Sequence, residues 1–191
     1  MTSDDYIKIF KESGALLEGH FVLTSGRHSS SYFQCAKVLQ YPKYLEMFSN
    51  EIASHFQSFE IDLVVSPAVG GIVIGTEVGR AMKKRTIFAE REDGKMRFRR
   101  GFNIKEKEKI LIVEDVITTG GSVKEVIQLI ENSGGVVEGV GVIVDRSSGL
   151  VTLHQNQLSL ASLEVKSYNS NEIPAELASM PIEKPGSRSL V

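Results

Sequence analysis

The sequence has very little cysteine and no long apolar run, and each shortage excludes a class of protein. With a single cysteine, Cys35, the chain cannot form an internal disulfide, which fits a reducing compartment. No apolar run approaches the roughly 20 residues of a membrane-spanning helix. The first residues, M-T-S-D-D-Y, are acidic and lack the basic-then-apolar pattern of a secretory signal. These features predict a cytoplasmic protein that does not enter a membrane.

The chain also lacks a strong charge of either sign. Its formal net charge is −2, from 22 Lys and Arg against 24 Asp and Glu, so electrostatics give no reason to expect nucleic acid or an anionic membrane as a partner. Of its 191 residues 41% are hydrophobic and 24% are charged, which is typical of a soluble globular protein. We therefore expect residues 1–191 to form one domain with at most a small appendage.

One stretch combines a buried strand with a loop suited to phosphate. Ile110–Val113 are apolar and mostly β-branched, which is typical of a parallel strand covered on both faces. Glu114 and Asp115 follow at the carboxyl end of the strand, the edge at which open α/β sheets bind ligands. A turn of small residues then leads into an amphipathic helix that ends at Gly134. The turn consists of Thr118, Thr119, Gly120, Gly121 and Ser122.

This loop offers two kinds of contact to one ligand. The carboxylates can accept hydrogen bonds from sugar hydroxyls or hold a hydrated metal, and the hydroxyls and free amides at the helix start can hold a phosphate. The combination predicts a site for a ribose 5-phosphate, and the alternative is an ordinary strand-to-helix loop with a serine cap. The sequence has no lysine directly after the glycines and no G-x-G-x-x-G, so two common nucleotide-binding motifs are excluded.

A second predicted strand leads into a similar loop. Ile61–Val65 is apolar, and S-P-A-V-G-G-I-V-I-G follows at residues 66–75 and opens a helix that continues through Met82. The loop is either a second anion site or a tight packing turn. Beside a ribose-phosphate loop it suits a diphosphate. With further strands predicted at 86–89 and 136–144, the alternation of strands and helices predicts an α/β fold with a parallel sheet.

Three further features are candidates for contacts with a substrate. Residues 90–102 are dense in charge around Asp93-Gly94, a hairpin signal, and form either a solvated hairpin or a mobile cationic flap that excludes water. Arg146 ends the 136–144 strand and is either a surface ion pair or a ligand for an anionic substrate. Tyr32 and Phe33 point to opposite faces of an extended segment, so either one ring is exposed for stacking or both are in the core.

The motif I-L-I-V-E-D-V-I-T-T-G-G-S resembles the phosphoribosyl diphosphate (PRPP) motif of the type I phosphoribosyltransferases. Other segments resemble the orotate phosphoribosyltransferase family, from about Asp5 to Arg188. They are G-H-F-V-L-T-S-G-R-H-S, Y-F-Q-C-A-K-V-L-Q-Y-P, P-A-V-G-G-I-V-I-G, F-A-E-R, R-R-G-F and V-D-R. The resemblance implies a parallel sheet flanked by helices, a small hood mainly from residues 1–40, with or without C-terminal segments, and a flexible β-hairpin flap at about 90–102.

The resemblance also implies a reaction. Members of that family transfer the phosphoribosyl group from PRPP to orotate, giving orotidine 5′-monophosphate and diphosphate in pyrimidine biosynthesis. They use Mg²⁺, which PRPP and water would hold near Glu114 and Asp115 without a direct protein ligand. They form homodimers in which the flap reaches the neighbouring subunit's site. The alternatives are a phosphoribosyltransferase for another base and a non-catalytic PRPP sensor, and the sensor is disfavoured by Lys95 and Arg97.

Carried onto this sequence, the resemblance assigns three groups of site residues. The catalytic group is Lys95, Asp115 and Glu114. The PRPP-binding group is Glu114, Asp115, Val116, Ile117, Thr118, Thr119, Gly120, Gly121, Ser122, Arg91, Lys95, Arg97, Val69 and Gly70. The orotate-binding group is Thr118, Arg146, Tyr32 and Phe33.

Three positions depart from the family pattern. Thr24 and Val69 stand where many bacterial members carry lysine, and Glu92 replaces a basic flap residue. We therefore expect diphosphate binding to depend more on backbone amides and on Arg91 and Lys95.

Overall fold

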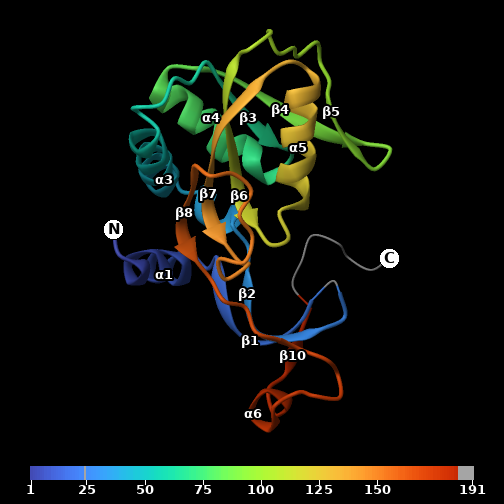
Figure 1. Ribbon diagram of the computed structural model, residues 1–191. Helices are drawn as coiled ribbons and strands as arrows, with labels where there is room; N and C mark the ends of the chain where they lie inside the picture. The colour runs from blue at the N-terminus through green and yellow to red at the C-terminus, as the bar shows by residue number, and fades with distance from the viewer. Residues whose placement is uncertain (24, 185–191) are drawn as a thin grey trace. The chain divides into compact units, whose positions relative to one another are not determined.

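A computed structural model describes residues 1–23 and 25–184, and the chain divides into two compact units (Figure 1). The first unit comprises Met1–Val38 and Glu164–Val191, and the second comprises Leu39–Leu163. Each unit contains its own sheet, one of four strands and one of six. None of the described helices is long and apolar enough to cross a membrane.

The first unit is built on a four-stranded sheet with the order β10-β1-β2-β9. Its outer strands come from the C-terminal segment, and its inner pair is an antiparallel hairpin. Phe33 lies in the core of this unit, with its ring 5.0 Å from that of Phe10. The elements are α1 (Ser3–Glu12), β1 (Leu16–Val22), β2 (His28–Phe33), β9 (Ser167–Tyr168), α6 (Ala175–Ala178) and β10 (Ile182–Glu183), with α2 (Ala36–Leu39) at the boundary between the units.

The second unit has a six-stranded sheet with the order β5-β4-β3-β6-β7-β8. All neighbouring strands are parallel except the β4–β5 hairpin, which confirms the predicted α/β fold with a parallel sheet. The turn of the hairpin is the predicted Asp93-Gly94 pair, and both residues have positive φ. The elements are α3 (Pro42–His55), β3 (Leu63–Pro67), α4 (Gly70–Met82), β4 (Arg85–Glu92), β5 (Lys95–Phe98), β6 (Lys109–Ile117), α5 (Gly121–Asn132), β7 (Val136–Asp145) and β8 (Gln157–Ser162).

The order of the strands places a switch point between β3 and β6. From β3 the chain passes through α4 to β4 on one side, and β6 then pairs on the other side of β3 and leads through α5 to β7. Ligands of open α/β sheets bind where the strand order reverses, outside the carboxyl ends of the strands. Both small-residue loops identified in the sequence follow these two strands, so the fold brings them to one place.

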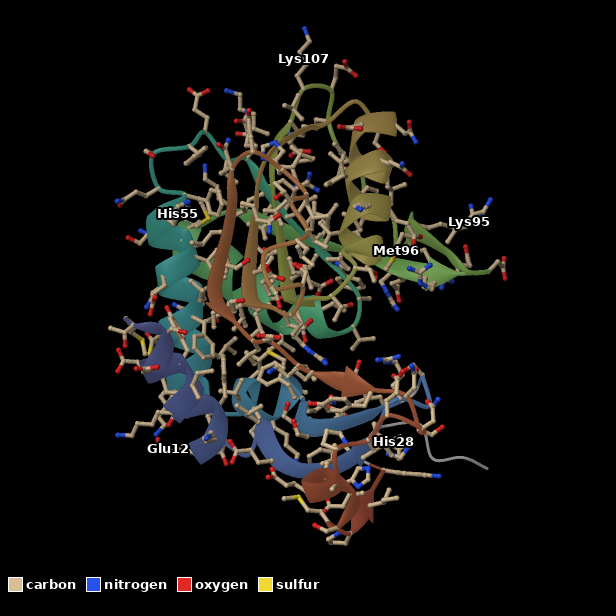
Figure 2. The ribbon with its side chains drawn as sticks, turned by 60° about the horizontal axis from the view of Figure 1, so that its bottom comes forward. Glu12, His28, His55, Lys95, Met96 and Lys107 are labelled. Carbon is tan, nitrogen blue, oxygen red and sulfur yellow. The ribbon has the colours of Figure 1, made fainter. Side chains whose placement is uncertain are left out.

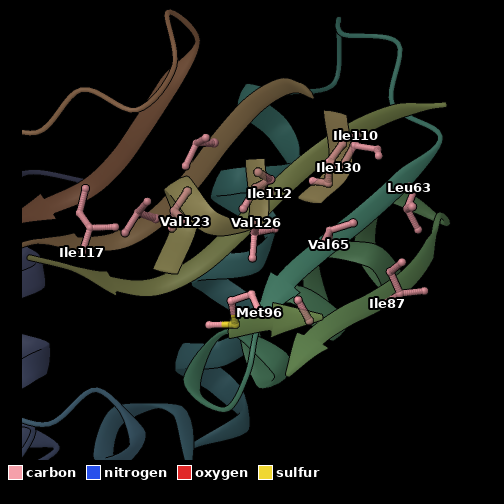
Figure 3. Close-up of a cluster of buried hydrophobic side chains, with 13 residues drawn as sticks. Leu63, Val65, Ile87, Met96, Ile110, Ile112, Ile117, Val123, Val126 and Ile130 are labelled. Carbon is pink, nitrogen blue, oxygen red and sulfur yellow. The ribbon is translucent and has the colours of Figure 1, made fainter. Parts of the chain in front are cut away.

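The core of the second unit explains why β3 and β6 are apolar throughout. Alternate residues of both strands pack on α5, as Figure 3 shows for Leu63, Val65, Ile110 and Ile112. The helix contributes the predicted stripe, of which Val123, Val126 and Ile130 are buried and Ile127 is partly buried. Full burial of each such side chain contributes about 1.5–3 kcal/mol. This packing fixes the start of α5 at the end of β6.

On the other face, α4 meets the sheet through a ladder of glycines at every fourth residue. Gly71, Gly75 and Gly79 lie on one side of the helix. A Cβ atom on Gly75 would lie 1.9 Å from Ser66 Oγ of β3, and one on Gly79 would lie 1.9 Å from Thr86 Oγ1 of β4. Since no real side chain tolerates such distances, α4 packs closer to the strands than a helix with side chains at these positions could.

Gly75→Ala is expected to lower the free energy of unfolding. Alanine favours a helix over glycine by about 1 kcal/mol, but overpacking a fixed core costs about 1–3 kcal/mol. The clash with Ser66 belongs at the upper end of that range because the side chain of Ser66 is fully buried. Urea unfolding followed by circular dichroism measures the change.

The matched test places the same substitution in a Ser66→Ala background, which lacks the colliding hydroxyl. There Gly75→Ala should cost at least about 1 kcal/mol less than in the wild type. Equal losses in both backgrounds would show that Ser66 is not the obstacle.

Candidate functional site

The loop between β6 and α5 forms a cradle with uncapped amides. Gly120, the N-cap of α5, has a φ of 70°, and a Cβ on it would lie 2.6 Å from Leu153 Cδ2 and 2.9 Å from Val151 Cγ1, so both conformation and space require glycine. No side chain in the described part of the chain caps this helix, which leaves first-turn amides for a ligand. The predicted residues Val116, Ile117, Thr118, Thr119, Gly120, Gly121 and Ser122 line one hollow of about 90 Å³.

The acidic pair lies at the end of β6 with its two members in different environments. The side chain of Glu114 is buried, and its Oε1 accepts a hydrogen bond of 3.0 Å from the amide of Asp115. Asp115 is half-buried, and its Oδ1 accepts one of 2.9 Å from the amide of Val116. Burial raises the pKa of Glu114 well above its usual range, and the charge of Asp115 raises it further. Glu114 therefore binds a proton more readily than an exposed glutamate does.

The loop after β3 reaches the same edge of the sheet. Its Ala68–Val69 peptide bond is cis, and the side chain of Val69 is 80% exposed. Gly70 begins α4 with its Cα against the carboxylate of Asp115, since a Cβ there would lie 2.4 Å from Oδ2. The predicted site residues of the two loops thus meet at the switch point, and the loop after β3 contributes mainly backbone.

Arg146 is fixed beside the end of β6. Its amide donates a 2.8 Å hydrogen bond to the carbonyl oxygen of Ile117. The buried carboxylate of Asp145 accepts hydrogen bonds from the amides of Ser147 at 2.6 Å and Gly149 at 3.2 Å, which shapes the turn that carries Arg146. Sequence reasoning missed this role of Asp145, although an aspartate before Ser-Ser-Gly is a signal for such a turn.

Three other supporting residues also escaped prediction. Val151 and Leu153 cover Gly120, and the side chain of Gln157 holds them there. Its Oε1 accepts a hydrogen bond from the amide of Leu153 at 2.8 Å, and its Nε2 donates one to the carbonyl oxygen of Val151 at 3.1 Å. The apolar alternation of V-T-L was the available signal, but nothing local to it indicates which loop it covers.

The predicted flap is docked as an edge strand in this structure. The carboxylate of Glu125 on α5 accepts hydrogen bonds from the Arg91 guanidinium, at 2.8 and 3.1 Å, and from the amide of Met96 at 3.2 Å. The Arg91 guanidinium lowers the pKa of Glu125. Arg97 pairs with Glu92, with 3.5 Å between Nε and Oε2.

Lys95 differs from the two arginines of the hairpin. It lies at the tip, is exposed and points away from the sheet, whereas Met96 is turned into the core (Figure 2). Lys95 has no ion pair with any of the residues that the structure describes. The structure therefore does not bring Arg91, Lys95 and Arg97 into the cradle of their own chain.

The remaining predicted residues belong to the first unit. Phe33 is only 4% exposed, while Tyr32 is half-buried and its hydroxyl donates a 3.2 Å hydrogen bond to Gln34 Oε1. Of the two rings, that of Tyr32 has accessible surface for a planar ligand. Thr24, one of the departures from the family pattern, lies outside the described residues.

Comparisons with known proteins agree on one family. A sequence model of the phosphoribosyl transferase domain matches residues 43–179. The chain is 57% identical over 190 residues to a Chlorobium phaeobacteroides (strain BS1) protein named orotate phosphoribosyltransferase, covering 100% of this chain and 98% of that protein. A solved orotate phosphoribosyltransferase from Aeropyrum pernix has a TM-score of 0.65 and 26% identity over 82% of this chain and 92% of that one.

The fold extends to enzymes named for another base. An adenine phosphoribosyltransferase from Thermoanaerobacter pseudethanolicus has a TM-score of 0.62 with 17% identity, over 70% of this chain and 88% of that one. At this identity the likeness concerns the fold alone, so the fold does not identify the base.

Glu114→Gln is expected to change how stability depends on pH in the absence of ligands. Because the pKa of Glu114 is raised in the folded protein, the folded state binds a proton more readily than the unfolded chain, and the free energy of unfolding falls as the pH rises above the unfolded value. Glutamine removes this loss, so the variant should gain stability relative to the wild type as the pH rises above the pKa that a glutamate has in the unfolded chain.

Urea unfolding of both proteins at a series of pH values measures the difference. Glu131→Gln, which removes an exposed carboxyl on α5, is the matched control. A difference between Glu114→Gln and the wild type that stays constant or shrinks with rising pH would contradict the raised pKa.

Proposed function

The chain belongs to the orotate phosphoribosyltransferases of the phosphoribosyl transferase family, and we propose on that premise that it transfers the phosphoribosyl group of PRPP to N1 of orotate. The products are orotidine 5′-monophosphate and diphosphate, in pyrimidine biosynthesis. The observation that carries the proposal is the position of the uncapped α5 cradle and the acidic pair together at the switch point. A ribose carrying phosphate groups at both ends needs donors on two sides and acceptors between them.

The two loops bind different parts of PRPP. The amides and hydroxyls of 118–122 bind the 5-phosphate, aided by the positive end of the α5 dipole. Asp115 and Glu114 accept hydrogen bonds from the ribose hydroxyls that lie between the phosphates, or donate hydrogen bonds to them. The backbone at Val69 and Gly70 binds the diphosphate, since the exposed side chain of Val69 offers no charge.

The base is recognised by its carboxylate and its planar ring. Arg146 is held beside the cradle, and a guanidinium binds a carboxylate bidentately. Thr118 lies at the rim of the same hollow and is exposed. The family resemblance assigns Tyr32 and Phe33 to the base, and Tyr32 is the one with accessible ring surface.

Mg²⁺ is the cofactor that the family implies, and the residues at the site fit it in an indirect way. Mg²⁺ keeps several waters and prefers carboxylate and phosphate oxygens. Among the described residues no group of three or more His, Cys, Asp and Glu could hold a metal. The half-buried Asp115 beside Glu114 would supply carboxylate oxygens to water or ribose hydroxyls around the ion. Bound there, Mg²⁺ would offset the negative charge of the diphosphate.

Catalysis requires stabilisation of the leaving group. As the bond from the anomeric carbon to diphosphate breaks, the ribose becomes oxocarbenium-like and the diphosphate takes the electron pair. Amides of the loop after β3 and the cations of the hairpin stabilise that charge once water is excluded. N1 of orotate forms the new bond to the anomeric carbon and releases its proton to the departing diphosphate or to solvent.

We also propose that the protein is a homodimer whose hairpins are shared. The direction of Lys95, away from its own sheet, supports delivery of this cation to a neighbouring subunit's site. The ion pairs of Arg91 and Arg97 are exposed and contribute only about 0–1 kcal/mol each, so a bound diphosphate can replace them.

Orotate should be the base that the wild-type protein converts. Spectrophotometry with PRPP and Mg²⁺ compares orotate with uracil, adenine, hypoxanthine and guanine. Turnover of another base in place of orotate would overturn orotate as the acceptor, and PRPP binding without any turnover would favour a sensor.

Arg146→Ala should lose about 10²-fold in kcat/KM for orotate, because the variant lacks a charged contact to the carboxylate.

Lys95→Ala should lower kcat by about 10²–10³ with little change in PRPP affinity, because the lost charge acts on the leaving diphosphate in the transition state. Lys107→Ala is the matched control, because it removes an exposed lysine just before the first residue of β6, at the end of the strand away from the acidic pair. A rate for Lys95→Ala within about threefold of the wild type would reject the role of Lys95.

Sharing of the hairpin can be tested with the same variant. Mixing Lys95→Ala with Asp115→Asn should give more activity than either variant has alone, because a mixed dimer contains one site with both residues intact. Failure to restore activity in dimers shown to exchange subunits would place Lys95 in its own chain's site.

A further inference from the structure

Gly70 lies against the carboxylate of Asp115 with no room for a side chain. A Cβ on Gly70 would be 2.4 Å from Oδ2 and 2.6 Å from both Cγ and Oδ1. All three atoms of the carboxylate are therefore closer than any real carbon contact allows. The carboxylate occupies the space that every other residue at position 70 would fill.

Neither the backbone nor the packing of α4 on the sheet explains this glycine. Gly70 is the first residue of a regular helix and is not among the glycines with positive φ. It also lies outside the ladder of Gly71, Gly75 and Gly79, whose neighbours include Ser66 and Thr86. Alanine would form the helix more readily than glycine. The remaining explanation for a glycine at position 70 is its contact with Asp115.

The elements on both sides of this contact are fixed, so the carboxylate is the part that can yield. The glycine ladder holds α4 against the strands. On β6, the residues that flank Asp115 are paired with β7, Glu114 with Val142 and Val116 with Val144. A methyl group on residue 70 would displace neither the helix nor the strand at low cost, and it would turn the side chain of Asp115.

We propose that Gly70 is a positioning residue that sets the orientation of the Asp115 carboxylate toward the ribose of PRPP. This inference rests on the proposed role of Asp115. It differs from a role of Gly70 as an amide donor to diphosphate, because alanine keeps the amide and adds only the methyl group. Because residue 70 has no side chain, the loop proposed to bind the diphosphate controls the orientation of the acid proposed to bind the ribose.

The test is a double-mutant cycle on PRPP binding, measured by calorimetry with Mg²⁺ and without orotate. The four proteins are the wild type, Gly70→Ala, Asp115→Ala and the double variant. Gly70→Ala should weaken PRPP binding by about 10–100-fold, the scale of a misplacement of about 1 Å. In the Asp115→Ala background the same substitution should have less than about a twofold effect.

Two controls separate positioning from general damage. Thr76→Ala changes an exposed side chain of the same helix, outside the glycine ladder, and should bind PRPP as the wild type does. The double variant lacks the clash and should be at least as resistant to urea as Gly70→Ala. Losses in PRPP binding that add in the double variant, or a Gly70→Ala protein that binds PRPP as tightly as the wild type, would overturn the proposal.

A crystal structure of Gly70→Ala gives a readout that does not depend on activity. The Asp115 carboxylate should be rotated away from α4 while the strands and the helix stay in place. An unmoved carboxylate would overturn the inference. A wild-type protein that fails to convert orotate would overturn the proposed function instead, and the structure and the binding cycle would still decide the role of Gly70.

Discussion

The close approach of α4 to the sheet is the constraint on which the site depends. Three glycines at every fourth residue remove the side chains that would separate the helix from β3 and β4. The start of the helix is therefore pressed against the end of β6, where the acidic pair lies. Because β3 and β6 flank the switch point, this contact joins the two loops that the chain separates by some forty residues of sequence, 66–71 and 114–122.

The same closeness resolves an electrostatic problem. A site for an anion with phosphate groups at both ends contains two acids, which would repel the ligand if both were fully charged and near the phosphates. Burial raises the pKa of Glu114, so the site takes up a proton more readily than two free carboxyls would. In the proposed complex the phosphates would contact helix N-termini and backbone amides, and the acids would face the hydroxyls between them. The negative charges of the ligand and of the protein would then lie apart along the length of PRPP.

The sequence was sufficient for the features that depend on local pattern. It predicted the buried strands, the hairpin turn at Asp93-Gly94 and the loop at 118–122, because each is set by neighbours in the chain. It did not predict the docking of the hairpin by Glu125, the turn shaped by Asp145 or the glycine ladder of α4. Those depend on contacts with other elements, and a glycine at every fourth residue has no meaning until its neighbour is known.

The hairpin illustrates why function was clearer from sequence than conformation. Its cationic residues indicated a role with a diphosphate, yet Arg91, Arg97 and Arg100 all pair with carboxylates in this structure. Such exposed pairs are weak, since solvent screens them and long side chains lose entropy in forming them. They hold the hairpin in place, and its arginines can still exchange these carboxylates for another anion. A ligand with several negative charges can outcompete single carboxylates for the same guanidinium groups, so the proposed cationic flap requires only that these weak pairs exchange partners.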